Sequence, residues 1–177
     1  MTTRRIAAAL LGILLTTVLL TGQGLAEQAK ATPEDVYRQV LQAHDVLQEL
    51  GQEGLAAFQG KDSEFVFKDT YVWVIDCGNW TNAAHPMMPS LVGQDLENLQ
   101  CRKTGKFFFQ EFCEVGSRPQ GGWVEYYWPK PGHPEDELFR KITFVIPVAG
   151  TPWLVASGIY NDKITIEELN QAFRYFE

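Results

Sequence analysis

The 177-residue chain has only three cysteines and three histidines, and this scarcity limits its metal chemistry. No C-x-x-C pair occurs and no histidine stands close to a cysteine, so the ligand spacing of a zinc site is missing. We therefore expect no metal and no cofactor. Three cysteines allow at most one disulfide and leave one thiol unpaired.

Long apolar runs are also absent, except at the N-terminus. There, a basic pair at 4–5 precedes an apolar run at 6–20, with small residues at Gly24 and Ala26. These are the three parts of a secretory signal, and the run is shorter than the roughly 20 residues of a spanning helix. An uncleaved anchor is the alternative. We predict cleavage after Ala26, no membrane span after processing, and a periplasmic or secreted mature chain, 27–177.

Positive charge is scarce. The chain has 15 Lys+Arg against 22 Asp+Glu, a formal net charge of −7. Cleavage of the predicted signal peptide removes two arginines and no acidic residues. The mature chain then has 13 basic and 22 acidic residues and a net charge of about −9. A field of that sign repels polyanions. We therefore expect no nucleic-acid partner.

Catalytic motifs are lacking as well. No serine stands in a G-x-S-x-G context, and no cysteine has the flanking sequence of a known nucleophile. Glu125 lies between aromatic residues on a predicted strand, but a two-carboxylate mechanism needs a partner at a defined distance and the sequence offers no obvious one. We interpret the chain as a protein that is not an enzyme.

The periodicity of the mature chain predicts one α+β domain. Thr32 and Pro33 are typical of the first positions of a helix, and apolar residues at helical spacing continue to the glycines at 51–54. β-Branched and aromatic runs predict about five strands. Because only one helix lies between strands, we expect an antiparallel sheet with the helices gathered on one face. The predicted strands are 71–75, 81–84, 122–128, 140–147 and 153–160, and the later helices are 106–115 and 165–176.

Aromatic residues crowd two of these strands. Alternation along 122–128 puts Trp123 on one face and Tyr126 and Trp128 on the other. One face would pack on helices, and we expect the loop at 87–100 to cover the other. A sheet face covered by a loop, with tyrosine and tryptophan polar tips pointing inward, is typical of a small-ligand pocket. The alternative is that these aromatics are core, and composition leaves both interpretations open.

Several motifs follow one another in a family-specific order. The most specific is Gly-Trp-Val-x-Tyr-x-Trp-Pro-Lys-Pro-Gly at 122–132, preceded by Tyr-Val-Trp-Val at 71–74 and Ala-His-Pro at 84–86, and followed by Ala-Ser-Gly-Ile-Tyr at 156–160. Together they resemble the single Cache domain, the extracellular PAS-like sensor module of bacterial chemoreceptors and histidine kinases. The resemblance covers about residues 36–160. It implies a long N-terminal helix on a five-stranded antiparallel sheet, with a ligand pocket between sheet and loop.

The same resemblance implies the residues of that pocket. Lys141 would supply a cationic contact, His85 would lie at the mouth, and aromatic residues of two strands would form the walls. Family ligands are often small carboxylates or other small polar metabolites, and a buried lysine with histidine and tyrosine donors suits an anion. The alternative for Lys141 is a solvated edge residue paired with Glu125 across the sheet. The predicted ligand-binding residues are Tyr71, Trp73, His85, Trp123, Tyr126, Trp128 and Lys141.

The chain departs from the family pattern in two ways. Residues 101–104 stand where the family usually has an aspartate before Gly105, and the spanning helices and cytoplasmic module of the membrane-bound members are not seen. We predict a free-standing exported ligand-binding sensor that passes its ligand or signal to another component, such as a membrane receptor or kinase. The alternative is an exported interaction subunit that docks a membrane partner with its pocket filled by side chains.

One cysteine pair is favoured over the others. Cys77 ends a predicted strand, and Cys113 lies in the middle of a helix that should pack across that strand's end. Cys101 lies in a loop whose family counterpart is not cysteine, so it would be the free thiol. Three buried thiols remain the alternative to a disulfide between Cys77 and Cys113.

Overall fold

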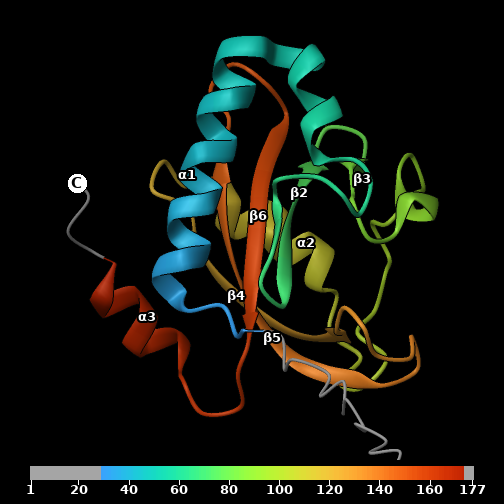
Figure 1. Cartoon of the computed structure of the whole chain (residues 1–177), viewed down its shortest axis with the longest axis vertical. Helices are drawn as coiled ribbons and strands as arrows, with labels where there is room; N and C mark the ends of the chain where they lie inside the picture. Colours follow the sequence, from blue (N-terminus) through green and yellow to red (C-terminus); the bar gives the residue numbers. More distant parts are fainter. Residues whose placement is uncertain (1–28, 174–177) are drawn as a thin grey trace, which may run out of the picture.

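Figure 1 shows the computed structural model of the chain, which describes residues 29–173. The predicted signal peptide, 1–26, and residues 174–177 at the end of the predicted C-terminal helix lie outside this range. None of the helices between 29 and 173 has the length and apolar character that crossing a bilayer requires.

Six antiparallel strands form the sheet, in the order β1-β2-β6-β5-β4, and β3 pairs with β2. The predicted antiparallel α+β domain is therefore confirmed. The short β1 is an addition that the periodicity did not predict. Along β2, β1 pairs with its first residues and β3 with its last, on the side opposite β6. The strands are β1 Val66–Phe67, β2 Thr70–Asp76, β3 Thr81–Ala84, β4 Gly122–Pro129, β5 Leu138–Pro147 and β6 Trp153–Tyr160.

The long helix α1, Pro33–Leu50, covers one face of the sheet over β5 and β6. Thr32 and Asp35 form a capping box at its start, which satisfies backbone N–H groups that have no partner within the helix. One stripe of the helix is buried against the sheet, and burial of a large aliphatic side chain contributes about 1.5–3 kcal/mol. A 3₁₀ turn, Gly51–Phe58, continues the chain. The buried α1 residues are Val36, Val40, Ala43 and Leu47.

The C-terminal helix α3, Ile166–Ala172, lies on the same side and contacts β4. Its capping box joins Thr165 and Glu168, as the sequence predicted, and Leu169 is its one buried residue. Together α1 and α3 close an apolar core on this face, which we call the α1 face.

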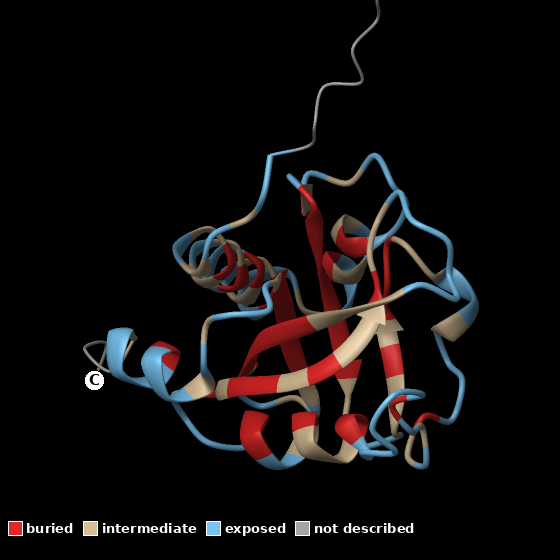
Figure 2. Ribbon diagram, turned by 90° about the horizontal axis from the view of Figure 1, so that it is seen from below, coloured by how far each residue is buried: buried red, intermediate tan, exposed pale blue. Residues whose placement is uncertain are grey.

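The third helix, α2 (Phe108–Gly116), lies on the opposite face of the sheet, which we call the α2 face. The expectation that all helices gather on one face is therefore wrong. The reason is that the aromatic side chains of β2 and β4 present more apolar surface than the loop alone can shield from solvent. The loop at 87–100 includes a single 3₁₀ turn, Pro89–Leu91. Leu96 of the same loop packs beside α2. Figure 2 shows the resulting buried strands between helices on both sides.

Candidate ligand-binding site

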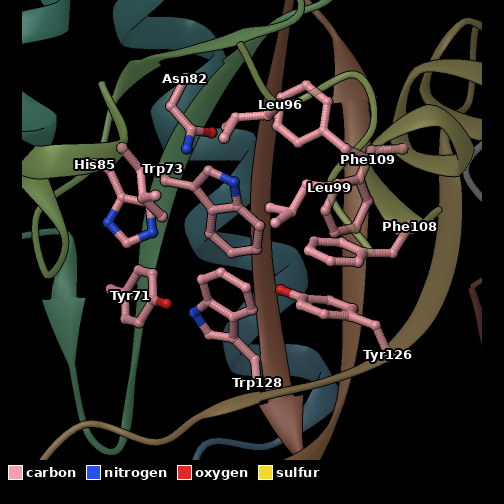
Figure 3. A pocket seen from close by; sticks show the side chains of 12 residues that line it. Tyr71, Trp73, Asn82, His85, Leu96, Leu99, Phe108, Phe109, Tyr126 and Trp128 are labelled. Carbon is pink, nitrogen blue, oxygen red and sulfur yellow. The ribbon is translucent and has the colours of Figure 1, made fainter. Parts of the chain in front are cut away.

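A cavity of about 20 Å³ lies between the α2 face of the sheet and its cover. That volume holds about one water molecule, so the lining side chains nearly fill the site, and a larger ligand has to displace some of them. Figure 3 shows side chains from β2, β3, β4, α2 and the loop after β3 converging on it. The lining residues are Tyr71, Trp73, Asn82, His85, Leu91, Leu96, Leu99, Phe108, Phe109, Phe112, Tyr126 and Trp128.

Aromatic ring contacts hold these walls in place. Phe108 stacks on Tyr126 with ring centroids 4.6 Å apart, and Phe112 meets the same tyrosine edge-on at 5.2 Å. Tyr71 lies 5.0 Å from the ring of His85 and 5.6 Å from that of Trp73. Such pairs contribute about 0.5–1.5 kcal/mol beyond their buried area, so these ring contacts hold the walls of the pocket together.

Cross-strand register places Lys141 on the α2 face. Lys141 of β5 stands opposite Tyr126 of β4 on one side and opposite Tyr160 of β6 on the other. Residues directly opposite each other share a face of an antiparallel sheet. Lys141 therefore projects toward the aromatic walls. It does not pair with Glu125, whose carboxylate bonds Arg140 instead at 2.5 Å.

The ammonium group of Lys141 is enclosed by aromatic rings. The side chain is 0 % exposed, and its Nζ lies 4.0 Å from the Tyr71 ring centroid, 4.5 Å from that of Trp73 and 5.1 Å from that of Tyr160. Lys141 does not itself line the cavity, but two of these rings do. Within residues 29–173, Nζ has no hydrogen-bond acceptor. Burial lowers the pKa of Lys141 well below its usual range, and the negative charge of Asp69 opposes that shift.

His85 is a neutral hydrogen-bond donor in this pocket. Its Nδ1 accepts the backbone N–H of Met88 at 2.9 Å, which leaves Nε2 as the protonated nitrogen. Burial lowers the pKa of His85 to about 3, and the charge of Lys141 adds to the effect. The residue is only 3 % exposed, so it belongs to the interior wall rather than to an open mouth.

Three tyrosine hydroxyls on this face stay protonated. Burial raises the pKa of Tyr71, and its side-chain contacts with the Trp128 indole and the Tyr160 hydroxyl partly oppose the shift. Burial also raises the pKa of Tyr126 and Tyr160 well above the usual range. The hydroxyl of Tyr160 donates to the carbonyl of Pro129 at 2.7 Å. The site thus combines one cationic group with neutral donors, which is chemistry for an anion.

Trp123 does not belong to this group. It lies in the core of the α1 face, with its ring 5.1 Å from Phe144 and 5.6 Å from Phe173. Its assignment to the pocket walls is therefore wrong. Trp123 is an odd-numbered position of β4, whereas Tyr126 and Trp128 are even-numbered, so alternation sends it to the other face. Its buried indole N–H has no acceptor in the described range.

Sequence reasoning missed several pocket residues. The phenylalanines of α2 had been expected to line one side of a helix, but not to form a cavity wall. Asn82 was not predicted either, although it lies on a predicted strand. Simple alternation would place it on the same face as Ala84, which belongs to the core of the α1 face. The register shift between Val74 and Ile75 instead pairs Asn82 with Ile75 and turns its side chain toward the pocket.

A disulfide ties the pocket cover to the sheet. Cys77, which follows β2, and Cys113 of α2 are bonded, with their Cα atoms 5.7 Å apart. Cys101 is a buried free thiol. Because α2 carries three lining phenylalanines and β2 carries Tyr71 and Trp73, the bond connects two walls of the same cavity.

This geometry agrees with the comparison to known families. The chain belongs to the Cache domain family, whose model matches residues 56–177. Cache domains are sensory ligand-binding modules rather than enzymes, and the pocket described above is consistent with such a role.

Known relatives are chemotaxis receptors. The chain is 31 % identical over 103 residues to the methyl-accepting chemotaxis protein McpP of Pseudomonas putida, a match that spans 58 % of this chain and 18 % of that protein. The chain thus covers less than a fifth of that relative's length. A solved periplasmic sensor domain of a chemotaxis protein is 30 % identical, with a TM-score of 0.56 and coverage of 73 % of this chain and 90 % of that one.

Two further solved structures share the fold. One is a Cache chemosensory domain solved as the structural basis for carboxylic acid recognition, 25 % identical with a TM-score of 0.56, covering 73 % of this chain and 92 % of that one. The other is a methyl-accepting chemotaxis protein of Vibrio parahaemolyticus, 18 % identical with a TM-score of 0.59, covering 75 % and 90 %. The last likeness concerns the fold alone.

Proposed function

We propose that this chain is an exported sensory protein that binds a small carboxylate in the aromatic pocket. The observation that carries the proposal is Lys141, whose ammonium nitrogen is fully buried and has no acceptor among residues 29–173. An unpaired buried charge is unfavourable, and a bound carboxylate supplies the missing acceptor and opposite charge. Because the cavity is small and Lys141 lies behind its lining, the rings of Tyr71 and Trp73 have to move apart for the carboxylate to reach Nζ.

A neutral donor completes the proposed anion site around Lys141. The Nε2–H of His85 is the neutral donor in the lining, whereas the Trp128 indole N–H already donates to the Tyr71 hydroxyl. The rest of the wall is apolar and suits a short carbon chain. The lining contains no second cationic side chain, so one carboxylate is accommodated and a dicarboxylate is not.

The relatives support this assignment. One solved Cache domain, at 25 % identity, is described as recognising carboxylic acids. Another, at 30 % identity, is a periplasmic sensor domain. We place this chain in the same compartment, with its signal peptide removed after Ala26, and a membrane receptor or kinase is the partner class that we propose.

Calorimetric titration tests the proposal. Acetate, propanoate and butanoate are titrated into the wild-type protein, with methylamine as a ligand of the wrong charge. Lys141→Met keeps an unbranched side chain, one atom shorter, and removes the charge; it should weaken carboxylate binding by about 1.5–3 kcal/mol. Lys163→Met, at an exposed position, is the matched control and should bind like wild type. Equal affinities for wild type and Lys141→Met would remove Lys141 from the site.

A further inference from the structure

The side-chain oxygen of Asn82 is a second buried polar atom at the pocket without a hydrogen-bond partner among residues 29–173. Asn82 is 4 % exposed and lines the cavity. Figure 3 shows its amide at one end of the pocket, between Trp73 and Leu96, and directed into the cavity. A buried amide oxygen without a donor is rare in folded proteins.

The backbone of Asn82 already serves the fold. Its carbonyl accepts the N–H of Gly93 at 3.1 Å, and the residue forms a bridge with Val92. It also pairs with Ile75 across the β2–β3 ladder. These contacts fix the position of the side chain without using its amide. The amide oxygen is therefore free to accept a hydrogen bond from a ligand.

The side chains of Asn82 and Lys141 lie beside different residues of β2. Lys141 Nζ lies against the rings of Tyr71 and Trp73, whereas Asn82 is paired with Ile75, further along the strand. Three strand residues correspond to about 10 Å. Two hydrogen bonds of about 2.9 Å each leave about 4 Å between the ligand's polar groups, a distance that a bent chain of three methylene groups spans.

We propose that the pocket selects a short carboxylate that carries a hydroxyl at the end opposite the carboxylate, with Asn82 as the residue that recognises the hydroxyl. This inference rests on the proposed function, because Lys141 is assigned the carboxylate. A neutral hydroxyl suits the site better than an ammonium, since the lining contains no aspartate or glutamate to balance a second positive charge. The hydroxyl donates to the amide oxygen and restores the missing hydrogen bond.

A matched pair of ligands isolates the hydroxyl. 4-Hydroxybutanoate and pentanoate have the same number of heavy atoms and differ only in OH against CH₃. Calorimetric titration should give wild type about a tenfold preference for 4-hydroxybutanoate, the effect of leaving the amide unpaired with the other acid. Asn82→Leu, of similar size, should reverse the preference toward pentanoate. Asn170→Leu, exposed on α3, is the control and should retain the wild-type preference. 4-Aminobutanoate should bind more weakly than either acid.

The outcomes separate the two proposals. If both acids bind through Lys141 but with equal affinity, Asn82 is satisfied without the ligand and the inference is overturned, while the proposed function stands. If neither acid binds, the proposed function fails and the inference falls with it. If Asn82→Leu does not fold, the wild-type ratio alone decides: a preference for 4-hydroxybutanoate supports the inference, and equality overturns it.

Discussion

The α1 face and the α2 face of the sheet both exclude solvent, yet they treat their buried polar side chains differently. On the α1 face, the hydroxyl of Ser157 donates to the carbonyl of Tyr71 at 2.9 Å, and that of Thr70 donates to the carbonyl of Gly158 at 2.5 Å. The surrounding core is apolar. These hydroxyls are already hydrogen-bonded within the fold, so they need no ligand as a partner.

On the α2 face, Lys141 Nζ and Asn82 Oδ1 are buried as well, but neither atom has a hydrogen-bond partner in the described range. Trp123 on the α1 face also lacks an acceptor, but its indole is neutral, and an unpaired ammonium is far less favourable. The difference teaches that one face is built for stability and the other for binding. Substitutions should therefore change stability and affinity in opposite ways on the two faces.

The largest expected effect concerns the attachment of the α2 cover. The Cys77–Cys113 disulfide has a sequence separation of 36, and a loop of that size is worth about 4 kcal/mol in the chain-entropy account. Cys77→Ser with Cys113→Ser should lower the free energy of unfolding by about that amount in urea titrations. Hydrogen exchange should accelerate in α2 more than in α1. Cys101→Ser keeps the disulfide and is the control; equal loss in both variants would contradict a special role for the bond.

A smaller effect, of opposite sign on the two faces, tests the comparison itself. Lys141→Met removes an unpaired buried ammonium and should stabilise the ligand-free protein by about 1–3 kcal/mol. Ser157→Ala removes a satisfied hydroxyl and should destabilise it by about 0.5–1.5 kcal/mol. Both are measured by urea unfolding at pH 7. Destabilisation by Lys141→Met would show that the lysine belongs to the fold rather than to a binding site.

The smallest effect is a pH dependence due to His85. Burial lowers its pKa to about 3 in the folded protein, against an ordinary value of 6.5, so between these pH values the unfolded chain binds the extra proton. Stability is therefore lost as pH falls below 6.5, by about 1 kcal/mol between pH 7 and 5.5 for this group. His85→Gln should lose that part of the pH dependence, whereas His133→Gln, at an exposed position, should keep it. Identical curves for wild type and His85→Gln would refute the assignment.

Local patterns predicted the elements well. The capping residues and periodicity of α1 and the β-branched strands are properties of short segments, and the structure confirms the antiparallel α+β domain. Local sequence patterns did not predict which side of the sheet α2 covers. That side depends on which face carries the aromatic side chains of β2 and β4, and on how much of that face a loop leaves exposed.

The site was less predictable for the same reason. Alternation along β4 correctly separates Trp123 from Tyr126, but the resemblance placed both in the pocket without regard to face. Asn82 lies on a short strand with no hydrophobic pattern, and its place beside Ile75 depends on a register shift between Val74 and Ile75. Cross-strand register of that kind is set by tertiary pairing, which a single sequence does not reveal.

The structure of the complex with a short carboxylate tests the central claim most directly. Crystals grown with propanoate at saturating concentration should show its carboxylate oxygens about 2.7–2.9 Å from Lys141 Nζ, the usual length of a charge-assisted hydrogen bond. The carbon chain should lie among the aromatic rings between α2 and the sheet. Propanoate bound elsewhere, with Lys141 Nζ still without an acceptor, would contradict the account.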